Sequence, residues 1–438
     1  MELQEPIRRT VVNTVKFLAV DGVEKANSGH PGMPMGCADL AVELWTRHLR
    51  YSPADPRWAD RDRFVLSAGH GSMLLYSLLH LSGYEIAIED LQRFRQLDSK
   101  TAGHPEVNHD EGIETTTGPL GQGIATAVGL ALAGKMLAAR FPRPGFIGQR
   151  VFGICSDGDL MEGISHEACS LAGHLGLGNL KFFYDDNHIS IDGETELSLS
   201  DDAQMRFEAY GWFVQRIDGH DPSQIRAALD AAVAEHARPS LIIARTHIGH
   251  GSPNKHDSEK AHGSPLGKAE VELTKKAANW PLEPTFYVPE DVREVFRRRA
   301  EENSAVRAAW LQQLEALAPD ERAAWQSHMA RDVPATLIDE LFAEAAKLEL
   351  KPEATRALGG KLEQVAAKIC PWLVGGSADL NPSTNTFILG SPAVSRGEFV
   401  GRNIHFGIRE HAMAAINNGI TLSDAFVSFG STFLVFAD

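Results

Sequence analysis

The sequence predicts an α/β protein with a doubly wound parallel sheet, followed by a second α/β domain that is incomplete. Helical patterns at residues 120–141 and 223–237 alternate with runs of strand length, which favours a parallel sheet with helices on both faces. The runs are apolar throughout rather than alternating, as expected of strands that are buried on both sides. They span residues 63–69, 151–157, 180–186 and 239–248.

Composition divides the chain into three parts. A first α/β domain is expected over residues 1–310, and a charged, alanine-rich helical segment over 311–349 indicates a linker. A strand pattern resumes at "PWLVGGSADL" (371–380), and a helical pattern follows at 409–420. The second domain is therefore expected over residues 350–438.

Charge and cysteine content exclude several classes of protein. The 438 residues include 42 basic and 58 acidic side chains, and the net charge of -16 repels nucleic acid and anionic lipid. We therefore expect no nucleic-acid partner and no membrane partner. The four cysteines show no paired spacing, and no uncharged apolar stretch is long enough to span a bilayer. These features predict a soluble cytoplasmic protein, either an enzyme or a scaffold.

The segment "DGDLMEG" (157–163) places acidic side chains at the carboxyl end of a predicted strand. Asn187 follows the next strand, and a right-handed crossover would bring the two strand ends together. Asp157, the amide oxygen of Asn187 and the Ile189 carbonyl would form a hard oxygen set, suited to Mg2+ or Ca2+ that also binds phosphate. Gly158 lets the backbone approach such a phosphate. The alternative is an aspartate that only caps the next helix.

Four histidines lie in glycine-rich segments, within "NSGHPG", "SAGHG", "TAGHPE" and "KAHGSPLG". Such imidazoles can donate hydrogen bonds to phosphate or sugar oxygens and transfer protons near neutral pH. The chain lacks the helical histidine pair of zinc proteases, so no zinc site is expected. The segment "TTTGPLGQG" (115–123) forms a turn into a helix with Leu120 exposed; a plain turn is the alternative there. The four histidines are His30, His70, His104 and His262.

Nine segments together carry a resemblance to a known family. They are "ANSGHPGMPMG", "SAGHGSMLLY", "TAGHPE", "TTTGPLGQG", "SDGDLMEGISHEA", "YDDNHISIDG", "KAHGSPLG", "GGSADLNPS" and "FGIREHAM". In this order they resemble the transketolases, from about residue 7 to the last residue. The resemblance implies the thiamine diphosphate-binding fold. It also implies the cofactors thiamine diphosphate and Mg2+, with Ca2+ or Mn2+ as alternatives to Mg2+.

The resemblance assigns residues to the metal and the cofactor. Asp157, Asn187 and the Ile189 carbonyl would bind the metal. Glu410 would protonate the aminopyrimidine ring, which helps the cofactor to form its thiazolium carbanion. The diphosphate would be contacted by His70, Gly158 and His262. The thiazolium ring would be contacted by Gly118 and Leu120, and the pyrimidine ring by Phe433 and Phe436. The residues assigned to the cofactor also include Glu162, Asn187 and Glu410. A core strand "TFLVF" (432–436) is the alternative for the two phenylalanines.

The implied reaction is the reversible transfer of a two-carbon ketol unit from a ketose phosphate to an aldose phosphate, in the pentose phosphate pathway. The implied catalytic residues are His30, His262 and Glu410. His30, His104 and His262 would face the hydroxyls and the carbonyl of the substrate. Arg356 and Ser383 would hold the sugar phosphate, since a guanidinium suits that anion.

The implied reaction makes phosphorylated sugars the expected substrates. Transketolases are homodimers, so a second copy of the chain is also an expected partner. Glu162 and Glu167 match glutamates of the family's dimer interface, and Asp159 is expected at the surface.

Members of the family continue beyond the position that matches Asp438, so we expect the chain to be truncated and inactive alone. Dihydroxyacetone synthase, deoxyxylulose phosphate synthase and a non-catalytic subunit of the same fold are the alternatives. One departure is "ITLSDAFVSFG" (420–430), which lacks the family's Gly-Gly turn.

Overall fold

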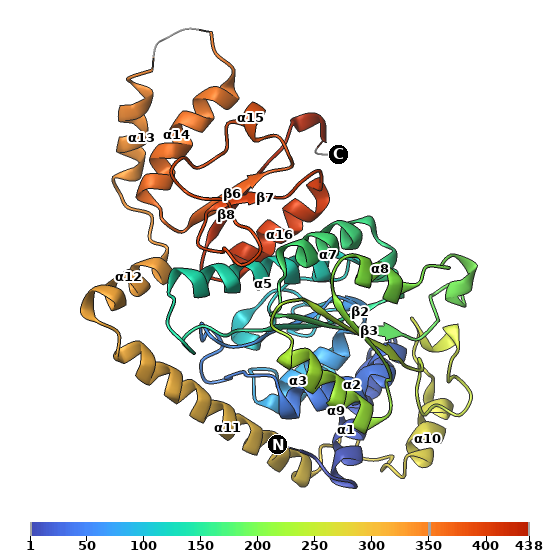
Figure 1. The fold of residues 1–438 in the computed structure, drawn as a ribbon. Coiled ribbons are helices and arrows are strands. Elements are labelled where there is room, and N and C mark those ends of the chain that lie inside the picture. Colours follow the sequence, from blue (N-terminus) through green and yellow to red (C-terminus); the bar gives the residue numbers. More distant parts are fainter. Residues whose placement is uncertain (1, 349–351, 437–438) are drawn as a thin grey trace.

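The structure is a computed structural model that describes residues 2–348 and 352–436. Its first domain contains a five-stranded sheet in which every neighbouring pair of strands is parallel (Figure 1). The strands are β1 (Arg63–Leu66), β2 (Val151–Ser156), β3 (Leu180–Asp186), β4 (Phe213–Asp218) and β5 (Ser240–Arg245). Their order across the sheet is β1-β2-β3-β5-β4. The predicted parallel α/β fold is confirmed.

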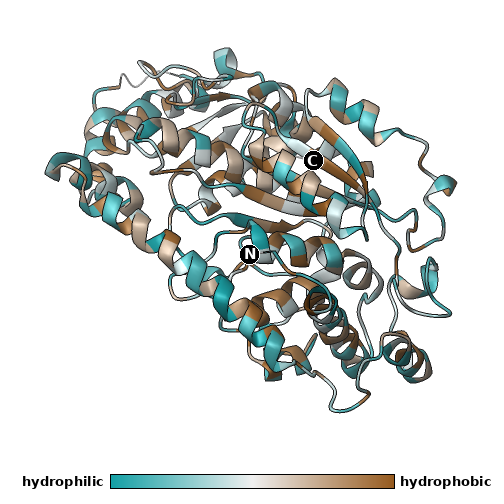
Figure 2. Ribbon diagram, turned by 60° about the horizontal axis from the view of Figure 1, so that its bottom comes forward, coloured by the Kyte–Doolittle hydropathy of each residue, from teal (hydrophilic) through white to brown (hydrophobic). Residues whose placement is uncertain are grey.

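Helices cover both faces of this sheet. Phe152 and Ile154 belong to one hydrophobic core, whereas Val151 and Cys155 belong to the other, as alternation along a doubly covered strand requires. The strands are mostly brown in Figure 2, and the outer helices carry much teal. The first face is covered by α1 (Ile7–Ala26), α2 (Gly32–Arg47), α3 (Ser72–Ser82) and α9 (Pro222–Ala234), and the second by α5 (Gln122–Arg140) and α7 (Gly163–Leu175). The shorter helices are α4 (Ile88–Gln92), α6 (Asp157–Met161), α8 (Ala203–Ala209) and α10 (Lys268–Ala277), with 3-10 turns at Gly69–Gly71, His109–Glu111, Thr195–Leu197 and Glu259–Ala261.

Three helices lead to the second domain. Helix α11 (Glu290–Glu315) runs unbroken through residue 310, and α12 (Pro319–Ala330) and α13 (Leu337–Ala345) follow it. The boundary predicted at 349–350 lies outside the described residues. The elements of the second domain are α14 (Thr355–Ile369), β6 (Leu373–Ser377), α15 (Asn381–Thr384), β7 (Asn403–His405), α16 (Glu410–Leu422), β8 (Val427–Ser431) and the 3-10 turn η5 (Leu434–Phe436). Its three strands form a parallel sheet in the order β7-β6-β8.

Helix α5 is the one helix in residues 2–348 and 352–436 that is long and apolar enough to cross a membrane. Of its most apolar window, 78% is buried inside the protein. The helix lies between the first sheet and α16 of the second domain (Figure 1). Packing on both sides therefore accounts for its apolar residues.

Two segments differ from the sequence pattern. Strand β4 was not marked by an apolar run, because it is a half-buried edge strand that pairs only with β5 and contains Gln215 and Arg216. The segment "TFLVF" (432–436) is not a strand. It follows β8 and forms η5, in which Leu434 is 89% exposed and Val435 71% exposed. The alternative of a buried core strand is therefore wrong for these residues.

Helices α5 and α16 cross at two glycines. A Cβ on Gly129 would lie 2.0 Å from the Ile416 carbonyl oxygen, and a Cβ on Gly419 would lie 2.0 Å from the Thr126 carbonyl oxygen. The two backbones are in direct contact, and only glycine leaves room for that. The crossing holds the second domain against the first.

Gly129→Ala is expected to destabilise the chain by about 2–3 kcal/mol, because the added methyl group forces two backbones apart. Urea unfolding of the 438-residue chain, followed by circular dichroism, measures the change. Gly359→Ala is the matched control, since Gly359 is also helical but no atom lies within 4 Å of its added Cβ. There we expect no loss, or a gain of up to about 1 kcal/mol. Equal losses in both variants would contradict a close crossing.

Buried charges also anchor the turn before β8. Arg63 bonds Glu114 at 2.7 Å and donates to the Ser423 carbonyl oxygen at 3.1 Å. The next residue, Asp424, has a φ of 63° and accepts from Arg331 at 3.1 Å. An aspartate held by charged partners thus takes the left-handed conformation at the turn between α16 and β8.

Candidate cofactor site

Asp157 begins α6 at the carboxyl end of β2. Ser156 pairs with Asp185 of β3, so Asp157 and Asn187 leave the sheet at the same edge. The Asp157 side chain is 4% exposed, and its Oδ1 accepts from the Tyr184 hydroxyl at 2.6 Å. Burial raises the pKa of Asp157 to about 7, although the Tyr184 bond opposes this. Its Oδ2 is buried with no partner among the described residues, and a bound cation would satisfy it.

A chain of hydrogen bonds orients the Asn187 amide. Its Nδ2 donates to Asp185 Oδ2 at 2.9 Å, and its Oδ1 accepts from the Ile189 N–H at 2.9 Å. The Thr246 hydroxyl donates to the other oxygen of Asp185. The Asn187 oxygen keeps a second lone pair for a ligand. The carboxylate, amide and carbonyl oxygens at this edge fit a hard cation such as Mg2+.

Glycines let the turn at Leu120 approach two other loops. A Cβ on Gly158 would lie 2.7 Å from Leu120, so this side chain packs directly over the glycine backbone. Gly118 has a φ of 137°, and a Cβ there would lie 2.9 Å from the His104 ring. A Cβ on Gly69 would lie 2.7 Å from the Gly118 nitrogen. Four of the predicted segments, "SAGHG", "TAGHPE", "TTTGPLGQG" and "SDGDLMEG", therefore meet in one place.

Three of the predicted histidines form a cluster of rings. The ring centroids of His30 and His70 are 5.2 Å apart, those of His70 and His262 5.1 Å, and those of His30 and His262 5.6 Å. Burial lowers the pKa of each ring and of His104, to about 4 for His30. The four rings are therefore neutral at pH 7. The Nδ1 of His262 is buried with no partner among the described residues, so it is available to a ligand oxygen.

The prediction that Asp159 lies at the surface is wrong. Its side chain is 0% exposed. Its Oδ1 accepts from the Ser67 hydroxyl at 2.7 Å and the Gly121 N–H at 2.8 Å, and its Oδ2 accepts from the Ser156 N–H at 2.9 Å and hydroxyl at 3.0 Å. Ser67 in turn accepts from the Ile124 N–H at 3.0 Å. Asp159 therefore ties the ends of β1 and β2 to the first turn of α5, and it positions the loop before that helix.

Arg95 lies beside the histidine cluster, although no sequence pattern marks it. It has a φ of 60°, and its Nη1 donates to the Ser28 hydroxyl at 2.8 Å. Its Nη2 lies 3.4 Å from Nδ1 of His30. A guanidinium at this position adds positive charge next to neutral imidazoles, which suits a phosphate ligand. A single arginine in a loop carries no periodic or motif signal.

The remaining predicted residues form a separate group in the second domain. Within residues 2–348 and 352–436, no hydrogen bond, ion pair or ring contact joins this group to the histidines or to Asp157. Glu410 begins α16 and accepts from a neighbouring threonine hydroxyl at 3.4 Å. The rings of Phe433 and Phe436 are 6.1 Å apart. Arg356 and Phe433 line a cavity of about 450 Å³, and exposed Ser383 precedes another residue of its lining, Thr384.

Glu162 and Glu167 lie at the start of α7, on the side of the second domain. The Glu162 side chain is exposed. Oε2 of Glu167 accepts from the Ala412 N–H at 3.0 Å, and thus satisfies a free donor in the first turn of α16. Arg409 donates to the Ser170 hydroxyl at 3.3 Å nearby. Within one chain, Glu167 therefore joins the two domains.

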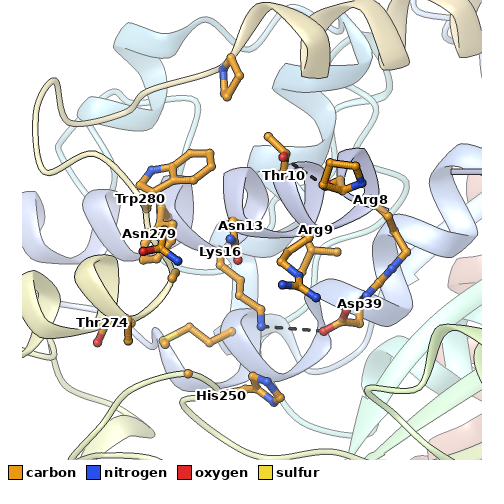
Figure 3. A pocket seen from close by; sticks show the side chains of 18 of the residues that line it. Arg8, Arg9, Thr10, Asn13, Lys16, Asp39, His250, Thr274, Asn279 and Trp280 are labelled. Atoms are coloured by element: carbon orange, nitrogen blue, oxygen red, sulfur yellow. Dashed lines mark hydrogen bonds and ion pairs between the residues drawn. The ribbon is translucent and has the colours of Figure 1, made fainter. Parts of the chain in front are cut away.

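A separate cavity of about 670 Å³ opens between α1 and α10 (Figure 3). Asp39 accepts from Arg8 at 2.8 Å and pairs with Lys16 at 3.8 Å, and His250 also lines the wall. None of the predicted site residues lines this cavity. Because its buried charges pair with one another, we do not assign the cofactor to it.

Two family models match the chain. "Transketolase, thiamine diphosphate binding domain" matches residues 7–334, and "Transketolase, pyrimidine binding domain" matches residues 351–438. Transketolase 1 of Vibrio cholerae is 49% identical over 439 residues, which cover 98% of this chain and 66% of that protein. The chain thus spans about two thirds of the length of the curated relatives that it matches.

Solved structures agree with these matches. Transketolase from Leishmania mexicana has a TM-score of 0.93 at 42% identity, over 98% of this chain and 64% of that chain. Transketolase from Pichia stipitis, in complex with sedoheptulose 7-phosphate, has a TM-score of 0.92 at 39% identity, over 98% of this chain and 65% of that chain. Mutants of the Pichia enzyme are complexes with fructose 6-phosphate and xylulose 5-phosphate. In sequence and in fold, this chain belongs to the transketolase family.

Proposed function

We propose that this chain supplies the cofactor site of a transketolase, which transfers a two-carbon ketol unit reversibly from a ketose phosphate to an aldose phosphate. The observation that carries the proposal is the buried Oδ2 of Asp157, which has no partner among the described residues. It lies at a strand edge that the turn of Gly118 and Leu120 joins to the histidine segments. The strand edge fits Mg2+, with Ca2+ or Mn2+ as alternatives. We place the reaction in the pentose phosphate pathway and in the cytoplasm, because the four cysteines are free and buried.

The residues of the first domain would bind and orient the reactants. Asp157, Asn187 and the Ile189 carbonyl would hold the metal, and His70 and His262 would bond the diphosphate. Thiamine diphosphate, when bound, supplies the electron sink that carbon–carbon bond cleavage needs. The neutral rings of the cluster can take a proton from a substrate hydroxyl and return it, since each has one acceptor nitrogen. We assign that proton transfer to His30 and His262 of the cluster and to the neighbouring neutral ring of His104.

The residues of the second domain would serve the site of a second copy. Ile408 is 78% exposed and Leu434 is 89% exposed, and they flank Glu410 and Phe433 in the sequence. Exposed apolar side chains of this kind favour burial against another protein surface. In a homodimer, the second domain of each copy would cover the first domain of the other. Glu410 would then reach the pyrimidine ring, and Arg356 would reach the sugar phosphate together with Ser383.

Calorimetry of the 438-residue chain with thiamine diphosphate and Mg2+ tests cofactor binding. Ketol transfer is tested with a protein extended to the length of the curated relatives. The donors are the sugar phosphates of the Pichia complexes, and the acceptor is an aldose phosphate. A preference for formaldehyde would instead favour dihydroxyacetone synthase. A preference for pyruvate would favour deoxyxylulose phosphate synthase. Binding of the cofactor without any transfer would indicate a non-catalytic subunit.

Mixed pairs of subunits test whether two copies share each site. In a protein extended to the length of the curated relatives, Asp157→Asn and Glu410→Ala should each abolish ketol transfer by the homodimer. When the two variants are mixed and allowed to exchange, about a quarter of the activity should return, because each mixed pair holds one intact site. A mixture of Asp157→Asn with Asn187→Ala is the matched control. Both changes lie in the first domain, so this mixture should recover nothing. No recovery in the first mixture would place the whole site within one chain.

A further inference from the structure

Two histidines and an aspartate converge in the loop that follows β5, and none of them belongs to the predicted site. One ligand atom from each of His247, His256 and Asp257 lies within 4.8 Å of the others. Nδ1 of His247 lies 2.8 Å from Oδ2 of Asp257, and Nε2 of His256 lies 3.4 Å from the same oxygen. We propose that these three side chains bind a transition-metal ion of the Zn2+ class, at a position separate from the Mg2+ of the cofactor.

The donor set selects the kind of ion. Two imidazole nitrogens and one carboxylate oxygen suit Zn2+, Co2+, Ni2+ or Cu2+, whereas Mg2+ prefers oxygen alone. In a tetrahedral zinc site the ligand atoms are about 3.4 Å apart, as bond lengths near 2.0–2.1 Å require. The pair of His256 and Asp257 already has this spacing at 3.4 Å. The pair of His247 and Asp257 has to open by about 0.6 Å from its present 2.8 Å.

The three side chains are partly exposed, so an ion can reach them from solvent. His247, His256 and Asp257 are 36%, 40% and 37% exposed. A fourth position can therefore be taken by water, as in zinc sites with three protein ligands. No zinc site was expected from the sequence, because it lacks a pair of histidines at helical spacing. Here the ligands come from a loop that returns on itself, which leaves no fixed spacing in the sequence.

The backbone of this loop is held independently of the three side chains. The Asp257 N–H donates to the Ile248 carbonyl at 2.9 Å, which returns the chain to its starting point. On the far side of the loop, the Asn254 N–H donates to Glu270 at 2.8 Å, and the Ser252 hydroxyl donates to the same carboxylate. The ligand positions are thus set before an ion arrives, which reduces the ordering that binding requires.

A neighbouring pair of histidines marks the boundary of the site. Nδ1 of His250 lies 2.9 Å from Nε2 of His220, and Nδ1 of His220 lies 3.3 Å from Asp39. These nitrogens are paired with one another, and Lys16 and Arg8 bring positive charge to the same carboxylate (Figure 3). A second cation is disfavoured there, so we do not include His250 among the ligands.

The metal would link the end of β5 to the segment that leads into His262. Ala261 lies directly before His262, and its carbonyl oxygen would be 2.5 Å from a Cβ on Gly32, in the segment that follows His30. An ion that joins His247 to Asp257 therefore stiffens a loop that packs against the histidine cluster. Its role would be to hold this loop, and it need not touch the substrate.

The test is titration of the chelator-treated 438-residue chain with ZnCl2, and separately with CoCl2, in the absence of thiamine diphosphate. We expect one Zn2+ per chain, visible absorption bands from bound Co2+, and a rise in Tm when Zn2+ is present. His256→Ala and Asp257→Asn should each weaken Zn2+ binding by at least about tenfold. Asparagine keeps the size of Asp257 and tolerates its φ of 52°.

Three control variants locate the ion. His236→Ala removes an exposed histidine elsewhere, His250→Ala removes the neighbouring ring, and Asp157→Asn removes the proposed Mg2+ ligand. All three should retain the Zn2+ affinity of the unmodified chain, and excess Mg2+ should not displace the ion. Loss of binding in Asp157→Asn would overturn the proposal in favour of the cofactor site. Loss in His250→Ala, unchanged binding in His256→Ala, or no Zn2+ binding at all would also overturn it.

Discussion

Asp157→Asn is expected to weaken the binding of thiamine diphosphate with Mg2+ by at least about 100-fold. Asparagine has the same shape but no charge, and removal of one partner from a buried ionic contact costs about 3–5 kcal/mol. Each 1.4 kcal/mol corresponds to about a tenfold change in affinity. The Tyr184 hydroxyl can still donate to the amide oxygen, so the local structure should persist. Calorimetry with the 438-residue chain measures the change.

The unliganded stability of this variant gives a second, opposite readout. In the native sequence, burial raises the pKa of Asp157 to about 7, so the charged carboxylate is costly without an ion. Asp157→Asn removes that cost, and the Tm without ligand should stay the same or rise. Asp192→Asn, an exposed change in the loop after Asn187, is the matched control and should leave affinity and Tm unaltered. Affinities within about twofold of each other for Asp157→Asn and Asp192→Asn would contradict a metal ligand at Asp157.

Asp159→Ala is expected to lower the free energy of unfolding by about 3–5 kcal/mol. The substitution leaves the Gly121 and Ser156 N–H groups buried without an acceptor, and it releases the Ser67 hydroxyl. Asp159→Asn should be intermediate, because the amide keeps one oxygen but turns two N–H groups toward donors. Urea unfolding of the chain measures both variants.

Asp192→Ala is the control for this series, and it should change the free energy of unfolding by less than about 0.5 kcal/mol. The loss in Asp159→Ala should also weaken cofactor binding, since the loop before α5 carries Leu120. If Asp159→Ala also changes the free energy of unfolding by less than about 0.5 kcal/mol, the four hydrogen bonds contribute little.

The fold was predictable where burial is written into composition. Strands β2 and β3 are covered on both faces, so their apolar runs stand out in the sequence. Strand β4 escaped prediction because it is only partly buried and therefore tolerates Gln215 and Arg216, whereas β1, the other edge strand, is fully buried and has an apolar run. The segment "TFLVF" has the composition of a strand, but it lies beyond the last pairing partner and remains exposed. Tertiary context, and not local propensity, decided both cases.

The residues of the candidate site were predictable where a short segment of the sequence contains the whole signal. Glycine-flanked histidines and the strand-end Asp157 could be marked because each has a local signature. Asp159 also had one, since Ser156 and Asp159 have the spacing of a capping box, with the acid in the first turn of the helix. That pattern indicates a role in capping α6, whereas the burial of Asp159 also depends on Ser67 and Gly121, which only the fold brings to it. Arg95 reaches His30 only through the fold, so no linear pattern could reveal it.

The close crossing of α5 and α16 at two glycines couples the positions of the two domains. No side chain lies between the backbones at Gly129 and Gly419 that could repack to absorb a displacement. Helix α5 starts immediately after the turn that places Leu120 over Gly158, and α16 starts at Glu410. In the proposed homodimer, a displacement of Glu410 would therefore be passed along α16 and α5 toward Leu120.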